Sequence, residues 1–297
     1  MYDSKLKTLL TVYKLGNYTS AAKALNLTQP AVSQQIALLE QEYGIKIFNR
    51  YGNKILPTSY GQILINYAKR IISIYKELDI KISDERKQVQ SLAIGITHSL
   101  EGNIIPEVLA TFASNNKGMQ IKIITDSIKN LYDKLSTYEI DLAVIEGKIS
   151  GDKLSKVLLD TDSLVAVISN DNPLSKNTII DINDLKKEKL ILRTNKSATR
   201  NLFTSQLEVS NLSLDDFNVI LEIDNTFSIK ELVAKNIGVS ILPKSICYHE
   251  FKDKRLTILP IRDMNMITEI NLVFIKNTIN EDIINDIVNT YREMSTK

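Results

Sequence analysis

Apolar residues recur at helical spacing through the first 57 of the 297 residues. Helices are expected over 4–15, 18–25 and 29–43, because in each range apolar side chains return every three or four positions. Asn17 and Thr28 stand where side-chain caps of the second and third helices belong. A turn of three residues separates these two helices. Two short helices joined in this way predict a helix-turn-helix.

The third helix has two unlike faces. One is apolar at buried-stripe spacing and is expected in the core. The other is polar near the helix N-terminus, where Gln29, Ser33 and Gln34 lie. Glutamine can bond an adenine edge, serine can bond a base or a phosphate, and the helix N-terminus favours phosphate. These residues could also merely solvate a surface helix, but the tight turn before them and the basic segment after them favour DNA contact. The expected core residues are Val32, Ile36, Leu39 and Tyr43.

A short basic hairpin follows Gly44. Residues 45–50 and 54–56 read as two strands around a turn that contains Gly-Asn, a pattern typical of a wing. Arg50 and Lys54 flank this turn. Their cationic side chains could reach phosphates or a minor groove.

One long helical pattern runs from a cap at Thr58 to about Lys87. Its apolar positions are spaced alternately by four and three residues over nearly three heptads. Such a seam could pack on its own domain, but a long helix between two domains more often pairs with another chain. We therefore expect a dimer interface along the seam. Its residues are Leu64, Ala68, Ile71, Tyr75, Leu78 and Ile82.

From residue 91 the pattern changes to short apolar runs that alternate with amphipathic helices. This alternation predicts mostly parallel sheets with helices on both faces. Residues 260–265 are a plausible joint between two α/β lobes. Strands are expected at 92–96, 120–125, 142–145, 163–168, 189–192, 219–223, 240–242 and 270–275, and helices at 103–115, 127–137, 198–209, 227–236 and 280–294.

Two segments of this body suit a small anion, because each follows an expected strand and precedes a helix. Hydroxyl and backbone N–H groups at such a position can hold a carboxylate, sulfate or phosphate. Ordinary helix capping would use the same residues, and Arg200 could be a surface charge. The candidates are Thr97, His98 and Ser99 in the first segment and Thr194, Lys196, Ser197, Thr199 and Arg200 in the second.

Composition adds a charge asymmetry. Hydrophobic residues make up 43% of the chain, enough for two or three domains with cores of their own. Residues 1–90 carry 13 Lys and Arg against 7 Asp and Glu, whereas residues 91–297 carry 24 against 28. A basic head on an acidic body indicates that the head meets a polyanion.

Catalytic chemistry is sparse. The chain has two histidines, His98 and His249, and one cysteine, Cys247. Neither a Cys/His cluster with metal spacing nor a glycine-rich phosphate loop is present, so we expect no enzyme, no metal and no cofactor. A single cysteine permits no intrachain disulfide, which fits a reducing compartment. Signal-peptide and membrane-spanning patterns are also missing, so a cytoplasmic protein is expected.

A series of residues in the first sixty or so carries a family resemblance. It runs through 17–25 and 29–36 and continues with Leu39, Glu40, Gly44, Phe48, Arg50, Thr58 and Gly61. In order and spacing the series resembles the head of the LysR-type transcriptional regulators. The resemblance implies that Gln29, Pro30, Ser33 and Gln34 face DNA and that Arg50 and Lys54 lie in the wing. Gln34 departs from the arginine that many relatives carry at this position.

The resemblance also implies an organisation for the rest of the chain. It comprises a winged helix-turn-helix over 1–58, a linker and dimerisation helix over 59–88, and an effector-binding domain over 89–297. This domain would have the two α/β lobes of periplasmic solute-binding proteins, with the effector in the cleft between them. The first lobe would hold 91–162 and 266–297, and the second would hold 163–265. Thr226 is a further cleft candidate on this basis.

The two candidate loops resemble those of family members that control sulfur and cysteine metabolism or carbon fixation. The function expected is therefore a transcriptional regulator that binds a double-stranded DNA operator as a dimer or a dimer of dimers. A small molecule, with an anion as the leading candidate, would control it. A cytoplasmic solute-binding protein or enzyme that reuses the α/β body is the alternative, which the winged head disfavours.

Overall fold

The computed structural model describes residues 4–51, 54–87, 89–147, 151, 154–276 and 278–295. The chain forms two compact units, one of residues 1–91 with 136–139 and one of residues 92–135 with 140–297. We call them the head unit and the body. The domain boundaries predicted at 58 and 88 both lie within the head unit and stay predictions.

The head unit is built from short helices whose ends are set by local caps. The side chain of Asn17 accepts hydrogen bonds from the N–H groups of Thr19 and Ser20, and Thr28 accepts one from Ala31, so both predicted caps are confirmed. Gly44 ends the third helix in the left-handed conformation. The elements are α1 (Ser4–Leu15), α2 (Tyr18–Leu25), α3 (Gln29–Tyr43), β1 (Phe48–Tyr51), β2 (Lys54–Pro57) and α4 (Ser59–Lys87).

One apolar core holds this unit together. Val32, Ile36 and Leu39 of α3 are buried in it, as predicted. Tyr43 was expected there too, but its side chain is 53% exposed because α3 ends at that residue. Gly61 lies so close to the Ile47 carbonyl that a Cβ would fall 2.0 Å from the oxygen. A glycine is therefore needed where α4 begins.

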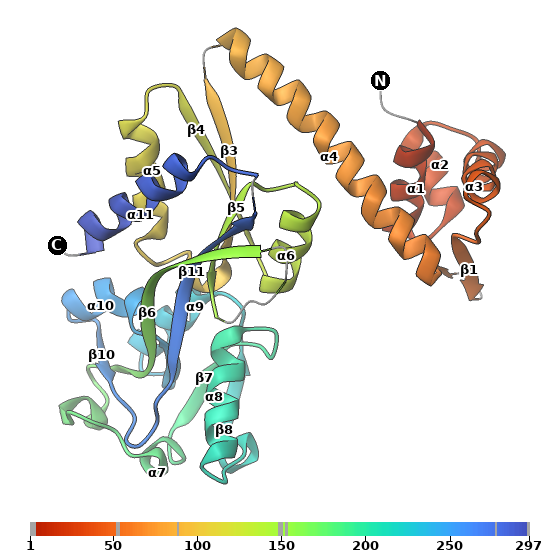
Figure 1. The fold of residues 1–297 in the computed structure, drawn as a ribbon. Helices are drawn as coiled ribbons and strands as arrows, with labels where there is room; N and C mark the ends of the chain where they lie inside the picture. The colour runs from red at the N-terminus through yellow and green to blue at the C-terminus, as the bar shows by residue number, and fades with distance from the viewer. Residues whose placement is uncertain are drawn as a thin grey trace. The chain divides into compact units, whose positions relative to one another are not determined.

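The body has two lobes joined by a shared sheet (Figure 1). The sheet order is β10-β6-β11-β5-β3-β4, and β9 also pairs with β6. We call the part with β3, β4, β5, α5, α6 and α11 the first lobe, and the part with β7, β8, β9, β10 and α7 to α10 the second lobe. Strands are β3 (Gln90–Thr97), β4 (Met119–Asp126), β5 (Leu142–Glu146), β6 (Leu154–Ser169), β7 (Lys189–Leu192), β8 (Asn218–Glu222), β9 (Ser240–Pro243), β10 (Leu256–Leu259) and β11 (Ile267–Ile275). Helices are α5 (Ile105–Asn115), α6 (Ile128–Ser136), α7 (Ile182–Leu185), α8 (Ala198–Val209), α9 (Thr226–Ala234), α10 (Tyr248–Lys252) and α11 (Glu281–Ser295).

The prediction of mostly parallel sheets is wrong. β3 pairs with β5, and β7 with β8, in parallel, but β6 runs antiparallel to β9, β10 and β11. β6 also begins at Leu154 and not near Ser163 as expected, which adds a long antiparallel pairing with β11. Its first part pairs with β11, which pairs in turn with β5 of the first lobe, and its last part pairs with β9 and β10 of the second lobe. This one strand therefore belongs to both lobes.

Separate cores support the two lobes. The first is centred on Ile94, Leu109 and Phe112, and the second on Leu190 and Phe203. Each lobe can therefore hold its own strand ends rigidly. The carboxyl ends of such strands are the usual place for a ligand in an α/β protein.

Candidate functional site

The N-terminal part of α3 presents a polar surface. Gln29, Pro30 and Gln34 are exposed, and Ser33 is half-buried. The Gln29 amide donates a 3.0 Å hydrogen bond to the Ser33 hydroxyl, which holds these two side chains together on one face. Such an arrangement can offer donors and acceptors to base edges.

The wing is placed beside α2 by an aromatic contact. The Arg50 guanidinium of β1 lies 5.9 Å from the centre of the Tyr18 ring and is otherwise exposed. The side chain of Lys54 and the turn residues Gly52 and Asn53 lie outside the described residues. Of the two predicted wing cations, Arg50 and Lys54, the structure therefore describes the side chain of Arg50.

The exposed apolar stripe of α4 differs from the predicted seam. Ala68 is fully buried, and Leu64 packs on the same head core, so Ala68 cannot contact a partner chain. The prediction for Ala68 is thus wrong, because α4 turns this side toward its own head. Side chains spaced by three or four residues are 40% to 63% exposed along one stripe, which keeps Ile71, Leu78 and Ile82 of the predicted seam; the predicted Tyr75 is 39% exposed beside it. The stripe consists of Tyr60, Ile63, Tyr67, Ile71, Ile74, Leu78 and Ile82.

In the body, a cavity of about 110 Å³ is lined by both lobes. The first lobe contributes Thr97 at the end of β3, Ser99 just after that strand and Glu146 at the end of β5. The second lobe contributes Arg193 after β7 and Ser197 at the start of α8. We call this space the interlobe cavity.

Glu146 is the buried carboxyl of the interlobe cavity, with 2% of its surface exposed. Burial raises the pKa of Glu146 to about 7, because a charged carboxylate loses hydration there. A hydrogen bond from Ser99 lowers the pKa, the charge of Asp162 raises it and the charge of Arg193 lowers it. The Oε2 atom is buried and finds no hydrogen-bond partner among the described residues.

Arg193 is the buried cation of the same cavity, with 4% of its surface exposed. Its Nε and Nη1 are buried and lack a hydrogen-bond partner within the described part of the chain. Burial lowers the pKa of Arg193, and the carboxylates of Asp224, Glu146 and Glu101 raise it. Buried donors without partners are rare in folded proteins, so these atoms point to a ligand that the guanidinium would bind.

The first lobe holds its hydroxyls in place. The Thr97 hydroxyl accepts a 3.2 Å hydrogen bond from the Glu146 N–H and lies 3.3 Å from the Ser99 hydroxyl. Thr97 and Ser99 are 5% and 6% exposed. The end of β3 is thereby tied to the end of β5, where Glu146 stands.

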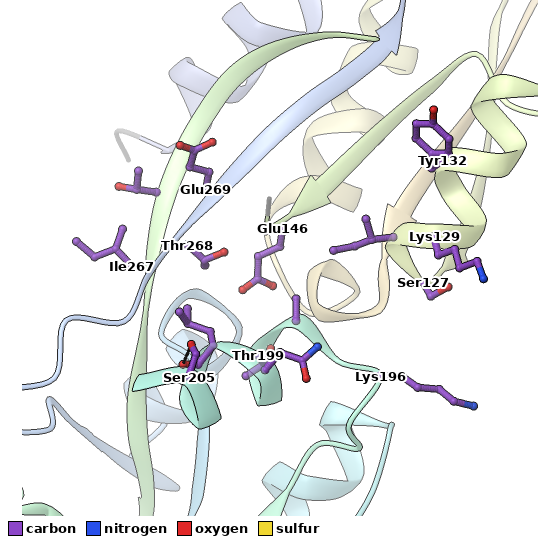
Figure 2. A pocket seen from close by; sticks show the side chains of 16 residues that line it. Ser127, Lys129, Tyr132, Glu146, Lys196, Thr199, Ser205, Ile267, Thr268 and Glu269 are labelled. Carbon is purple, nitrogen blue, oxygen red and sulfur yellow. Dashed lines mark hydrogen bonds between the residues drawn. The ribbon is translucent and has the colours of Figure 1, made fainter. Parts of the chain in front are cut away.

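A second, larger cavity of about 1210 Å³ adjoins the first (Figure 2). The two share Ser127, Ile128, Glu146, Lys196 and Ala198. In Figure 2 the Glu146 carboxyl points between Thr199 and Thr268, while Lys129 and Lys196 extend away from it. The buried Thr199 hydroxyl has no partner among the residues described. We call this space the large cavity.

The predicted ligand residues divide into two groups. Those that line a cavity are Thr97, His98, Ser99, Lys196, Ser197 and Thr199. Thr194, Arg200 and Thr226 line neither cavity. Thr194 instead donates to Asp224, Arg200 pairs with Glu222 at 2.9 Å, and Thr226 is buried in the first turn of α9.

Four of the described charged residues that line the interlobe cavity were not predicted from the sequence, and Glu146 and Arg193 are the two that are deeply buried. Each directly follows an expected strand, 142–145 and 189–192, as do Asp126 and Asp224, which also line the interlobe cavity. The rule that ligands bind at the carboxyl ends of strands would have found all four. The sequence prediction rested on hydroxyl-rich loops. An isolated acidic or basic residue after a strand is common at protein surfaces and therefore did not indicate a site.

A winged helix-turn-helix head and a two-lobed body with an interlobe cavity define a DNA-binding regulator that responds to a small molecule. The sequence comparisons agree. Residues 4–62 match the bacterial regulatory helix-turn-helix protein, lysR family, and residues 85–294 match the LysR substrate binding domain. The chain belongs to the LysR family of transcriptional regulators. As such it binds an operator, carries an effector-binding domain and forms oligomers.

Individual relatives cover almost the whole chain. A probable RuBisCO transcriptional regulator from Thalassiosira pseudonana is 28% identical over 263 residues, 86% of each chain. The transcriptional regulator CysL from Bacillus subtilis (strain 168) is 25% identical over 287 residues, 95% of each chain. The LysR family regulator CbnR, solved with its target DNA, has the same fold, with a TM-score of 0.69 and 16% identity over 99% of each chain. In the described part of this chain, no helix has the length and apolarity needed to span a membrane.

Proposed function

We propose that this regulator is controlled by a small effector with an anionic group, held in the interlobe cavity by Arg193. The buried Nε and Nη1 of the Arg193 guanidinium, which have no hydrogen-bond partner among the described residues, are the observation that carries the proposal. Thr97 and Ser99 from the first lobe and the N-terminus of α8 from the second add donors around the same space.

An effector bound there would contact both lobes at once. Since β6 belongs to both lobes, a change in their relative position is transmitted along a single strand. The effector shifts operator binding only if its affinity differs between two arrangements of the lobes. We propose that ligand binding, not turnover, is the task of this cavity, and that the protein acts in the cytoplasm on its operator.

The DNA-bound form is proposed to be a homodimer, or a dimer of dimers, that pairs along the exposed stripe of α4. Seven exposed apolar side chains, spaced three, four and four residues apart as in an eleven-residue coiled-coil repeat, support this pairing. The polar surface of α3 with Gln29, Ser33 and Gln34 is proposed to read bases, and Arg50 to contact the backbone.

The test compares Arg193→Gln with wild type. Operator fragments are selected from genomic DNA with the full-length protein, and small anions are screened for thermal stabilisation and for a change in operator affinity. We expect an anion that does both with wild type and neither with Arg193→Gln. Arg262→Gln, which removes an exposed arginine of the same body, should behave as wild type. An anion response that survives in Arg193→Gln would contradict the proposed site.

A further inference from the structure

The interlobe cavity places two buried groups of opposite charge in one small space. Glu146 and Arg193 are each at least 96% buried and both line it. Each keeps buried polar atoms without partners among the described residues: Oε2 of Glu146, and Nε and Nη1 of Arg193. Burying polar atoms in this state is unfavourable, and more so when the group is charged. A bound molecule that satisfies both groups would recover this cost.

Arg193 and Glu146 require ligand groups of opposite charge and opposite hydrogen-bonding character. The guanidinium carries only donors, so it needs an acceptor and prefers an anion. An ionised carboxylate carries only acceptors, so it needs a donor and prefers a cation. A plain anion satisfies Arg193 and leaves the Glu146 carboxylate facing a like charge. A molecule with an anionic and a cationic group a few bonds apart satisfies both.

We infer that the effector is a small zwitterion of the α-amino-acid type, with its anionic group on Arg193 and its ammonium group on Glu146. This inference rests on the proposed function, because it names the chemical class that fits the same cavity. Asp224, which also lines it, adds to the preference for an ammonium group, whereas the Asp126 carboxylate already pairs with Lys134 at 2.8 Å.

The cavity volumes divide such a molecule into two parts. About 110 Å³ suits the amino-acid head group but leaves little room for a long side chain. The large cavity opens from the same residues and is lined by Ile128, Leu202 and Ile267 as well as by the hydroxyls of Thr199 and Ser205. A side chain directed there would meet both apolar surface and hydroxyl groups. The interlobe cavity thus determines the chemical class of the effector through its head group. The large cavity determines which side chains within that class are accepted.

The protonation state of Glu146 allows a zwitterionic ligand to be distinguished from a simple anion by the protons released or taken up on binding. The groups that act on Glu146 are Ser99, Asp162 and Arg193. The other charged or titratable groups that line the two cavities are His98, Asp126, Lys129, Tyr132, Lys196, Asp224 and Glu269. With its pKa near 7, Glu146 is about half protonated in the free protein at that pH. An ammonium group favours the ionised form, so a zwitterion releases protons when it binds. A simple anion favours the neutral form and takes protons up.

The experiment uses the full-length protein. The twenty L-α-amino acids, their desamino carboxylic acids, and sulfate are screened by thermal shift. The best ligand is then titrated calorimetrically at pH 7 in two buffers of different ionisation enthalpy. We expect an amino acid to bind, to release up to about half a proton per site, and to bind roughly 30-fold more tightly than its desamino counterpart. Glu146→Gln should remove this preference, and Glu107→Gln, an exposed change on α5, should keep it.

Other results would overturn the inference. Desamino acids or sulfate that bind through Arg193 with proton uptake would contradict the zwitterion and leave the proposed anion site standing. An amino-acid preference that survives in Glu146→Gln would also contradict it. Should neither set of compounds stabilise the protein, both the zwitterion and the proposed anion site would be wrong. Thermal unfolding of unliganded Glu146→Gln shows whether the variant folds.

Discussion

Glu146, the last residue of β5, and Arg193, the first residue after β7, come from different lobes and line one cavity with buried polar atoms that lack partners among the described residues. This relationship distinguishes a ligand site from a structural ion pair, in which the two charges would satisfy each other. It also lowers the stability of the unliganded protein relative to the liganded one, because two desolvated groups have their hydrogen-bonding requirements met only when a ligand is bound.

The pH dependence of stability should reveal Glu146. Its pKa in the folded protein, about 7, lies above the ordinary 4.5, so the folded state holds the proton more tightly than the unfolded chain. Stability from this group is therefore greatest at low pH and falls as the pH rises from about 4.5 to 7, by roughly 3 kcal/mol at most.

Urea unfolding of wild type and Glu146→Gln at several pH values measures this effect. The difference in unfolding free energy between the two proteins should shift in favour of the variant as the pH rises through this range. A difference that stays constant would show that Glu146 titrates normally. Glu107→Gln, which removes an exposed carboxyl, serves as the control.

Arg50→Ala should weaken operator binding and make it less sensitive to salt. Each phosphate contact that is lost lowers the slope of log affinity against log salt by about 0.9. The change should be similar for operator and random DNA, because a phosphate contact carries little sequence information. Fluorescence anisotropy at several salt concentrations measures both quantities. An unchanged slope would place Arg50 away from the DNA backbone.

Gln34→Ala should instead change the base preference. Gln34 is exposed near the N-terminus of α3, where its amide can bond a base edge. We expect a loss of about 1–3 kcal/mol on operator DNA and little loss on random DNA. Equal losses on both kinds of DNA would assign Gln34 to the backbone. Gln41→Ala, a change of the same type near the other end of α3, is the control.

Leu78→Glu or Ile74→Glu should separate the oligomer. Both side chains are about half exposed in the single chain, and burying a leucine or isoleucine contributes about 1.5–3 kcal/mol. A charge placed in a paired seam would also face its symmetry mate. Sedimentation velocity should show a smaller species with weaker operator binding.

The control for this pair is Lys76→Glu, which also adds a carboxylate to α4 but at an exposed position off the stripe. It should leave the oligomer intact. If Leu78→Glu and Ile74→Glu keep the wild-type assembly, the exposed stripe is not the dimer interface.

Cys247 should be unreactive in the native protein. The thiol is fully buried, and burial raises its pKa to about 12, whereas the nearby Lys230 lowers it by less. Because the thiolate is the reactive form, a disulfide reagent at pH 8 should react only after unfolding. Rapid reaction of the folded protein would instead indicate an exposed or activated thiol.

The sequence alone determined the head and the kind of protein. Caps such as Asn17 and Thr28 act on N–H groups two or three residues away, so local order suffices to predict helix ends. Most strands after residue 91 were also found from their short, continuous apolar runs, but the first part of β6 and the whole of β10 were not. Family spacing through the first sixty residues then indicated the function.

Only the tertiary structure decided which face of α4 is buried and which distant charged residues lie in one cavity. Leu64 and Ala68 fit a heptad as well as Ile71 and Leu78 do, and only packing on the head core shows which side of α4 is already occupied. Glu146 and Arg193 are 47 positions apart, and single charged residues after strands carry no periodic signal. The pairing of β6 with strands of both lobes brings their elements together, and burial then turns two ordinary charges into a binding site.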